Sequence, residues 1–162
     1  GGATVALAAA GAEVCHVDAA KGMVTWARQN SAVSGLADRP VRWIVDDVFK
    51  FVEREKRRGR TYDGIIMDPP SYGRGPRGEV WKVEEKLYEF TDACMDLLSD
   101  RPLFFLINSY ASKFAPSVLA NILKATVDRR SKGQVSCGEI GLPVSSSGLV
   151  LPCGIYGRWE AR

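Results

Sequence analysis

Short apolar runs alternate along this chain with segments of helical period, and this alternation constrains the fold more than any other feature. The expected strands cover residues 13–17, 41–45, 62–67 and 103–107. The expected helices lie within residues 3–10, 23–33, 48–60, 87–98 and 116–123. This order predicts βαβ units and a mainly parallel α/β sheet. The tail, residues 134–159, predicts instead an antiparallel hairpin whose turn spans residues 143–148.

The composition excludes several classes of protein. A chain of 162 residues with 46% hydrophobic and 25% charged residues suits one globular domain. No apolar run is long enough to cross a membrane, and the first residues lack the basic start of a signal peptide. The scattered cysteines (Cys15, Cys94, Cys137 and Cys153) form no C-x-x-C pair, which favours reduced thiols in a cytoplasmic protein. Because His16 is the single histidine, we expect no metal site.

The chain opens on Gly1-Gly2 and continues directly into an expected helix. A glycine-rich turn that enters a helix normally follows a strand. We therefore expect a fragment cut inside its first βα unit, with the first strand missing. Gly1 and Gly2 would let the backbone approach a ligand closely.

Carboxylates follow three of the expected strands. Asp18 ends the first, Asp46 and Asp47 end the second, and Asp68 ends the third. The ends of parallel strands meet at one edge of a sheet, where an acid can accept hydrogen bonds from a ribose diol. Asp47 could accept from an adenine amino group, with Val48 and Phe49 beside the ring. The structural alternative is that these acids cap the helices that follow them.

The segment Asp68-Pro69-Pro70-Ser71 follows an apolar run and opens a glycine-rich loop over residues 71–79, which we expect to be mobile. Two prolines fix φ and donate no hydrogen bond, so a carboxylate and several free carbonyls would be held where a planar substrate can be gripped. The alternative is a strand-ending turn that uses proline only for stiffness.

The chain resembles class I S-adenosylmethionine-dependent methyltransferases and, more narrowly, the group that contains bacterial large-subunit ribosomal RNA methyltransferases. The resemblance covers nearly the whole chain and is carried by four segments: Gly1-Gly2-Ala3-Thr4, Val17-Asp18-Ala19-Ala20, Trp43-Ile44-Val45-Asp46-Asp47-Val48 and Asp68-Pro69-Pro70-Ser71-Tyr72-Gly73. It implies a Rossmann-like three-layer sandwich with strand order 3-2-1-4-5-7-6 and an antiparallel strand 7. Residues 1–162 would then be a single catalytic domain that lacks strand 1 and any N-terminal RNA-binding domain.

The resemblance also implies the ligands and the residues that bind them. The methyl donor would be S-adenosylmethionine and the product S-adenosylhomocysteine, with no metal. The expected cofactor-binding residues are Gly1, Gly2, Asp18, Ala19, Asp46, Asp47, Val48 and Asp68. The expected catalytic residues are Asp68, Pro69, Pro70, Tyr72 and Asn108.

Methyl transfer from a sulfonium is an in-line displacement, so catalysis is largely a matter of positioning. The Asp68 carboxylate and the Pro69 carbonyl can orient a base nitrogen, and Tyr72 can either stack on the base or pack on the sheet. The carbon-5 cytosine methyltransferases that the chain resembles place a nucleophilic cysteine after strand 5. Here that stretch is Ile107-Asn108-Ser109-Tyr110, which favours attack by a nitrogen, for example of guanine. Asn108 either contacts substrate or caps the turn after the strand.

Two groups of basic residues are candidates for contact with RNA phosphates. The group beside the Asp-Pro-Pro segment has the better location and comprises Arg74, Arg77, Lys82 and Lys86. The group within residues 54–60 alternates with Glu53 and Glu55 and is expected to form a solvated helix face. A net charge of +3 predicts weak RNA binding by this chain alone.

Our main hypothesis is therefore a ribosomal RNA nitrogen methyltransferase. Alternatives are a methyltransferase of protein or small molecules, a carbon-5 cytosine RNA methyltransferase, and a nucleotide-binding module without activity, because fold does not fix substrate. An NAD-binding domain would need G-x-G-x-x-G, which residues 1–6 do not supply. The sequence leaves the oligomeric state open.

Overall fold

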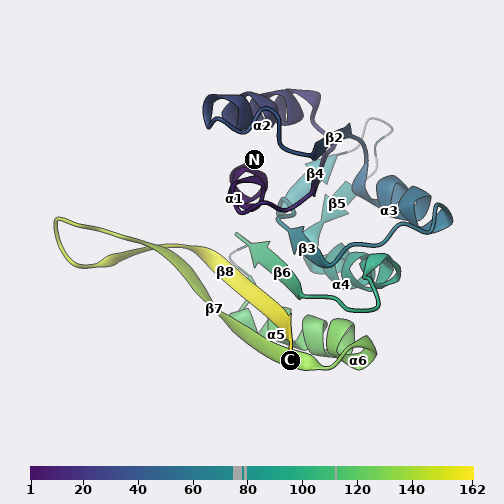
Figure 1. Ribbon diagram of the computed structural model, residues 1–162. Helices are drawn as coiled ribbons and strands as arrows, with labels where there is room; N and C mark the ends of the chain where they lie inside the picture. Colours follow the sequence, from purple (N-terminus) through teal and green to yellow (C-terminus); the bar gives the residue numbers. More distant parts are fainter. Residues whose placement is uncertain (75–77, 79, 112) are drawn as a thin grey trace. The chain divides into compact units, whose positions relative to one another are not determined.

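The structure is a computed structural model that describes residues 1–74, 78, 80–111 and 113–162. It forms two compact units, residues 1–58 (unit 1) and residues 59–162 (unit 2), whose elements are labelled in Figure 1. Arg77, one of the predicted RNA contacts, lies outside the described residues.

Unit 1 contains a two-stranded parallel sheet and three helices. Its elements are α1 (Gly2–Ala9), β1 (Val14–Asp18), α2 (Lys21–Val33), β2 (Val41–Val45) and α3 (Val48–Arg57). Helix α1 packs on α2 and β1, and α2 also contacts β2. The tight fit of α1 to α2 depends on small residues, because a Cβ added to Gly1 would lie 2.5 Å from the Ala27 Cβ.

The buried face of α2 differs from the predicted one. Helical spacing places Met23, Trp26, Ala27, Asn30 and Val33 on one stripe that we expected to face the core, but Met23, Trp26 and Val33 are 45%, 58% and 85% exposed. Ala27 is buried as expected, and Val24, which lies off the stripe, is buried as well. The helices approach each other closely only where side chains are small, so the largest apolar residues of α2 lie outside the contact.

Unit 2 is built around a four-stranded mixed sheet. Its elements are β3 (Gly64–Met67), β4 (Tyr72–Arg74), β5 (Val80–Lys82), α4 (Val83–Ala93), the 3₁₀-helix η1 (Cys94–Leu97), β6 (Phe104–Ser109), α5 (Pro116–Ala125), α6 (Val127–Arg130), β7 (Gly133–Pro143) and β8 (Val150–Ala161). The strand order is β3-β6-β8-β7, with β3 parallel to β6 and β8 antiparallel to both β6 and β7. This order equals the 4-5-7-6 part of the expected sheet, and the pair β2-β1 equals its 3-2 part, which confirms the mainly parallel α/β class and the C-terminal hairpin.

The core of unit 2 lies between this sheet and its helices. Phe105, Ile107 and Trp159 are fully buried. Helix α5 packs across β7 and β8, and it approaches so closely that a Cβ added to Gly157 would lie 2.7 Å from the Leu119 Cβ. The β7–β8 hairpin extends well beyond the helix that covers it (Figure 1).

The structure corrects the expectation for the segment after Asp68-Pro69-Pro70 and confirms the burial of Cys94. The segment after Asp68-Pro69-Pro70 was expected to be a loop, but β4 and β5 form a short antiparallel pair there, with Tyr72 opposite Lys82. Cys94 lies on an apolar stripe of helical spacing within residues 87–98, which predicts a core position, and this is confirmed because it is 3% exposed and burial raises its pKa to about 12. All four cysteines are free thiols.

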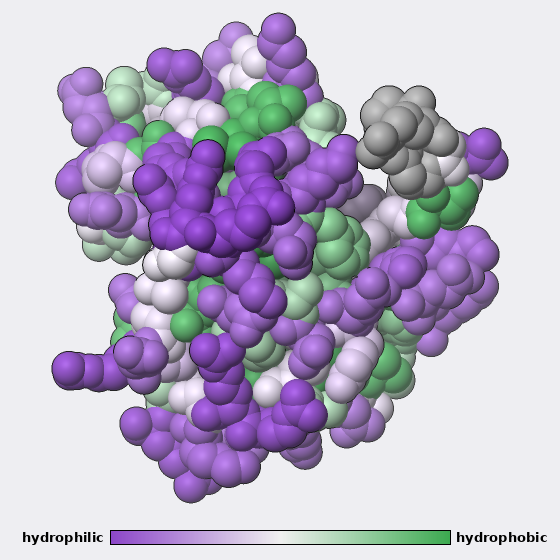
Figure 2. All heavy atoms as spheres, turned by 90° about the vertical axis from the view of Figure 1, so that its right-hand side faces the viewer, coloured by the Kyte–Doolittle hydropathy of each residue, from purple (hydrophilic) through white to green (hydrophobic). Residues whose placement is uncertain are grey.

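Charged and polar side chains predominate on the face shown in Figure 2, where hydrophobic residues form separate smaller patches. Within the described part of the chain, no helix is long and apolar enough to cross a membrane.

Candidate functional site

The acidic residues of unit 1 follow β1 and β2 at the same edge of the parallel pair. Asp18 lies opposite Val45 in the register, and the Asp46 N–H donates to the Asp18 carbonyl oxygen at 3.1 Å. The carboxyl ends of the two strands are therefore joined, and the acids that follow them are brought together as predicted from the sequence. Ala19 and Asp47 are exposed beside this edge, and Val48 is half-buried.

Each of these acids also has a structural role. Asp47 is the N-cap of α3, where its Oδ1 accepts from the Lys50 N–H at 3.0 Å. Asp46 Oδ1 accepts from the Asp47 N–H at 2.9 Å, and its other oxygen pairs with Arg54. The capping alternative is thus correct for Asp47, although one cap bond uses only one of its two carboxylate oxygens.

Asp18 is not a helix cap. The N-cap of α2 is Ala20, and Asp18 Oδ1 accepts from the Ala20 N–H at 2.7 Å. This short-range bond fixes the turn between β1 and α2 and leaves the second carboxylate oxygen for a ligand. An acid held in this way at a strand end suits a ribose diol.

The two opening glycines differ in their surroundings. Gly1 is needed for packing, because Ala27 occupies the space that a Cβ would take. A Cβ added to Gly2 would meet no atom within 4 Å. Of the two, Gly2 therefore has the open space beside its backbone that a bound cofactor requires, and it lies at the start of α1, where backbone N–H groups are unsatisfied.

In unit 2 the Asp-Pro-Pro segment directly follows β3. Asp68 makes no hydrogen bond or ion pair with the described residues, and although the residue is exposed, partial burial of its carboxylate raises its pKa above the usual 3.8. The expectation of several free carbonyls needs correction: the Pro70 carbonyl accepts from Trp81 Nε1 at 2.6 Å. The Pro69 carbonyl accepts no hydrogen bond from the described residues, so two adjacent acceptors, Asp68 and Pro69, stay open.

The end of β6 lies beside this segment. Met67 pairs with Ile107 in the parallel register, which places Asp68 and Asn108 at equivalent positions of neighbouring strands. Asn108 lies within β6 opposite Tyr156, and α5 begins only at Pro116, so Asn108 does not cap the turn.

Sequence reasoning missed Tyr110, which follows β6 directly. Its ring lies against β8, where a Cβ added to Gly154 would be 2.7 Å from the Tyr110 Cδ1. Burial, the nearby Asp68 charge and Cys153 all raise the Tyr110 pKa, so its hydroxyl is neutral and lies in the electrostatic neighbourhood of Asp68. The signal was available, because Tyr110 is the first aromatic residue after the strand end that carries Asn108.

The basic residues near this segment are largely engaged with neighbours. Arg74 Nε donates to the Tyr72 hydroxyl at 2.7 Å, which holds the half-exposed Tyr72 ring on β4. Lys82 and Lys86 form ion pairs with Glu85 and Glu89, each at 2.8 Å. A phosphate would have to compete with these carboxylates.

The second basic group is not a purely solvated face. Glu55, which was expected to be exposed, is fully buried and bonds to Arg42 and Arg58, each at 3.1 Å. In the described part of the chain, no group of three or more histidine, cysteine or acidic side chains is arranged to hold a metal ion.

Comparisons with known proteins agree with this geometry. The structure matches the crystal structure of a SAM-dependent methyltransferase from Agrobacterium tumefaciens with a TM-score of 0.91 and 38% identity, covering 100% of this chain and 53% of that chain. A candidate methyltransferase complexed with S-adenosylhomocysteine shares the fold, with a TM-score of 0.70 and 22% identity over 96% of this chain and 41% of that chain. The chain therefore has the fold of the class I S-adenosylmethionine-dependent methyltransferases.

Within that class, its sequence is similar to large-subunit ribosomal RNA methyltransferases. It is 25% identical over 133 residues to ribosomal RNA large subunit methyltransferase K of Neisseria meningitidis, which is 76% of this chain and 38% of that protein. It is 36% identical over 64 residues to methyltransferase I of Shewanella denitrificans, which is 40% of this chain and 16% of that protein. The chain thus spans less than half the length of these relatives. No known family profile matches it.

Proposed function

We propose that this chain is the catalytic domain of an enzyme that transfers a methyl group from S-adenosylmethionine to a nucleobase nitrogen of ribosomal RNA, in the cytoplasm. The observation that carries the proposal is the pair of open acceptors, the Asp68 carboxylate and the Pro69 carbonyl, at the end of β3 and beside the end of β6. The relatives named as ribosomal RNA methyltransferases support the choice of substrate.

The cofactor side of the proposal rests on unit 1. Asp18 and Asp47 each have one carboxylate oxygen outside their backbone hydrogen bonds, for a ribose diol and an adenine amino group respectively. Gly2 has open space beside its backbone, and Ala19 and Val48 flank the same strand ends. When bound, S-adenosylmethionine supplies an activated methyl group, so these residues only have to bind and orient it.

The acceptor side rests on unit 2. An exocyclic or ring nitrogen that bears hydrogen can donate to Asp68 and Pro69, which orients its lone pair for in-line attack. Tyr72 offers an exposed ring for stacking, and Asn108 offers amide groups at the neighbouring strand end. Cys153 donates its thiol to the Leu151 carbonyl at 3.3 Å, and residues 107–110 contain no cysteine, so a nitrogen target is favoured over carbon 5 of cytosine.

We further propose that residues 1–162 form one catalytic domain in which the open edges of β1 and β3 weaken cofactor binding. Among the described residues, β1 pairs only with β2, and β3 has β6 on one side only. Open strand edges have backbone groups in need of partners. Residues 1–162 should therefore bind S-adenosylhomocysteine weakly. Tight binding by residues 1–162 alone would contradict this part of the proposal.

Two measurements test the enzyme proposal. Calorimetry should detect binding of S-adenosylhomocysteine and no binding of NAD, which separates a methyltransferase from a dinucleotide-binding module. Incubation with a labelled methyl donor and either ribosomal RNA or total protein, followed by identification of the labelled nucleoside, should give a methylated base nitrogen. Label found only in protein, or on carbon 5 of cytosine, would refute the proposed reaction.

A further inference from the structure

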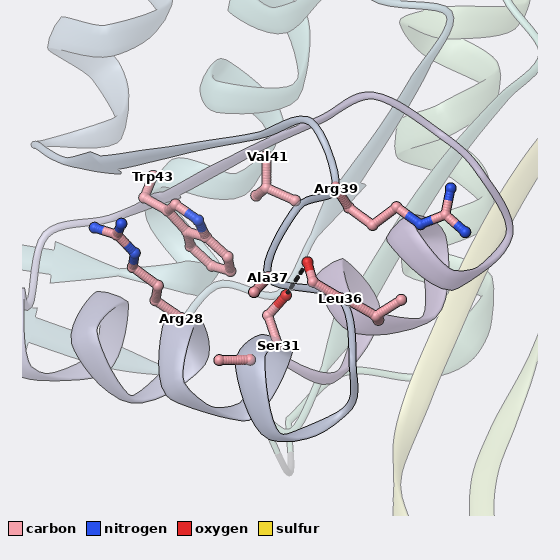
Figure 3. A pocket seen from close by; sticks show the side chains of 8 residues that line it. Arg28, Ser31, Leu36, Ala37, Arg39, Val41 and Trp43 are labelled. Atoms are coloured by element: carbon pink, nitrogen blue, oxygen red, sulfur yellow. Dashed lines mark hydrogen bonds between the residues drawn. The ribbon is translucent and has the colours of Figure 1, made fainter.

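A second concave site lies in unit 1, away from the aspartates. It is a pocket of about 330 Å³ between the second half of α2, the segment that follows it and the start of β2. Its lining residues are Arg28, Ser31, Ala32, Leu36, Ala37, Arg39, Val41 and Trp43 (Figure 3). The acids of the candidate cofactor site follow the other ends of β1 and β2, so the pocket is at the opposite edge of this sheet.

Two guanidinium groups at the pocket have no ion-pair partner in the part of the chain that the structure describes. Neither the Arg28 nor the Arg39 guanidinium forms a salt bridge or hydrogen bond with the described residues, and both residues are exposed. Figure 3 shows Arg28 alongside the Trp43 ring, and Arg39 near Leu36 on the opposite side of the pocket, where its side chain extends outward. Asp38, the nearest acid in the sequence, does not line the pocket. The pocket is therefore flanked by uncompensated positive charge.

The aromatic wall of the pocket is held in place from behind. Trp43 is half-buried in β2, and its ring centroid lies 5.2 Å from that of His16 on β1. The buried Ser31 donates its hydroxyl to the Leu36 carbonyl at 3.3 Å, which ties the end of α2 to the segment that closes the pocket. The remaining lining side chains are small or aliphatic. None of the described residues forms a hydrogen bond with the Trp43 indole that a ring stacked on it would have to displace.

We propose that this pocket binds one nucleotide of single-stranded RNA, with the base against Trp43 and the flanking phosphates on Arg28 and Arg39. A guanidinium fork matches phosphate geometry, and aromatic side chains are the usual stacking platforms for unpaired bases. The inference rests on the proposed RNA substrate and extends it: RNA is gripped at the far edge of unit 1 as well as beside Asp68. Arg28 and Arg39 would also provide positive charge for RNA phosphates, whereas the charges of Lys82 and Lys86 are already paired with Glu85 and Glu89.

The test is the affinity of the protein for a short fluorescent single-stranded RNA, measured by anisotropy over a range of salt concentrations. The double substitution Arg28→Ala and Arg39→Ala should weaken binding about tenfold. It should also make the negative slope of log affinity against log salt shallower by about 1.4, or about 0.7 for each lost phosphate contact. The matched control, Arg101→Ala with Arg162→Ala, removes the same charge from exposed positions outside the pocket and should keep the wild-type slope.

Two further readouts separate the possible failures. Calorimetric binding of S-adenosylhomocysteine should be the same in all variants, which shows that unit 1 stays folded. RNA containing 4-thiouridine should form a photo-crosslink that peptide mass spectrometry locates at Trp43. Equal RNA binding by the pocket variant and its control would overturn the pocket and leave the methyltransferase proposal standing. Binding of free mononucleotides, but not RNA, at these arginines would overturn it as well. If the wild type and both variants bind S-adenosylhomocysteine but none of them binds RNA, the proposal that RNA is the substrate would be refuted.

Discussion

The two units of this chain are held together in different ways. In unit 2 the central strand β6 alternates buried and half-buried residues, and large side chains such as Phe105 and Trp159 fill the core. In unit 1 neither strand contributes a buried residue, and the least exposed apolar side chains are those of Ala8 and Ala27. Apolar burial provides most of the stability of a core, so unit 2 is the stable scaffold. Unit 1 depends more on polar contacts, such as the ion pairs of the buried Glu55.

The acidic residues at the strand ends also differ between the two units, because those of unit 1 have structural roles and Asp68 of unit 2 has none among the described residues. Asp18, Asp46 and Asp47 all bond to local backbone N–H groups and help to build the turns they belong to. Asp68 has no such partner among the described residues and has a raised pKa. An acid without a structural role at a strand end is the stronger candidate for chemistry, whereas the acids of unit 1 combine binding with local structure.

The largest effect that follows from this contrast concerns Asp68. Asp68→Ala should reduce methyl transfer about 10²–10³-fold, because a positioned charged acceptor is lost from the reacting site, while S-adenosylhomocysteine binding and stability stay nearly unchanged. Single-turnover transfer to RNA measures the first and calorimetry the second. Because the Asp68 pKa lies above 3.8, the wild-type rate should rise with pH through that raised value as the carboxylate ionises. Unchanged turnover in the variant would remove Asp68 from the site.

The next effect concerns the buried charge of unit 1. Glu55→Ala leaves the Arg42 and Arg58 guanidiniums without their shared partner and should destabilise the protein by about 3 kcal/mol, toward the lower end for a buried pair because both arginines are partly exposed. Urea unfolding gives the difference. Glu53→Ala on the same helix is the control and should stay within about 0.5 kcal/mol of wild type, because Glu53 is exposed. Equal effects of the two substitutions would mean that the Glu55 ion pairs add nothing to unit 1.

Asp47 allows binding to be separated from capping. Asp47→Asn keeps an oxygen for the Lys50 N–H, so stability should be almost unchanged, whereas Asp47→Ala should cost about 1 kcal/mol through loss of the cap. Both should bind S-adenosylhomocysteine about tenfold more weakly, since the charged acceptor for the adenine amino group is gone. Wild-type affinity in Asp47→Asn would leave Asp47 with its structural role only.

Sequence patterns located the strands of the two larger sheets because each is rich in apolar residues and is followed by a turn signal, and β2 matches its expected range of residues 41–45. The short strands β4 and β5 were not predicted. These patterns failed where packing depends on close approach or on distant partners. Hydrophobicity selected Trp26 for the core, but the α1–α2 contact admits only small side chains such as Ala27. The burial of Glu55 depends on Arg42, thirteen residues away on a strand, which no local pattern contains.

The same limit applies to the candidate site. The acids at the strand ends could be predicted, because chain order and strand direction place them at one edge. The occupied Pro70 carbonyl and the β4–β5 pair could not, because both depend on Trp81, which reaches back across a glycine-rich segment. Convergence of the aspartates of both units on one ligand stays a prediction.

The smallest expected effect is a pH dependence confined to unit 1. Burial lowers the pKa of His16 below 6.5, so the unfolded chain binds a proton more readily than the folded protein. Stability from this source is complete above pH 6.5 and is lost as pH falls from 6.5 through the lowered pKa. His16 is the sole histidine, so urea unfolding at stepped pH values should show this loss in wild type and a flatter profile in His16→Gln. Because the Thr4 hydroxyl bonds to His16 Nδ1 between α1 and β1, amide hydrogen exchange should place the loss in unit 1. If the substitution leaves the pH profile unchanged, or if amide protection is lost in unit 2, then His16 is not the group whose protonation destabilises unit 1.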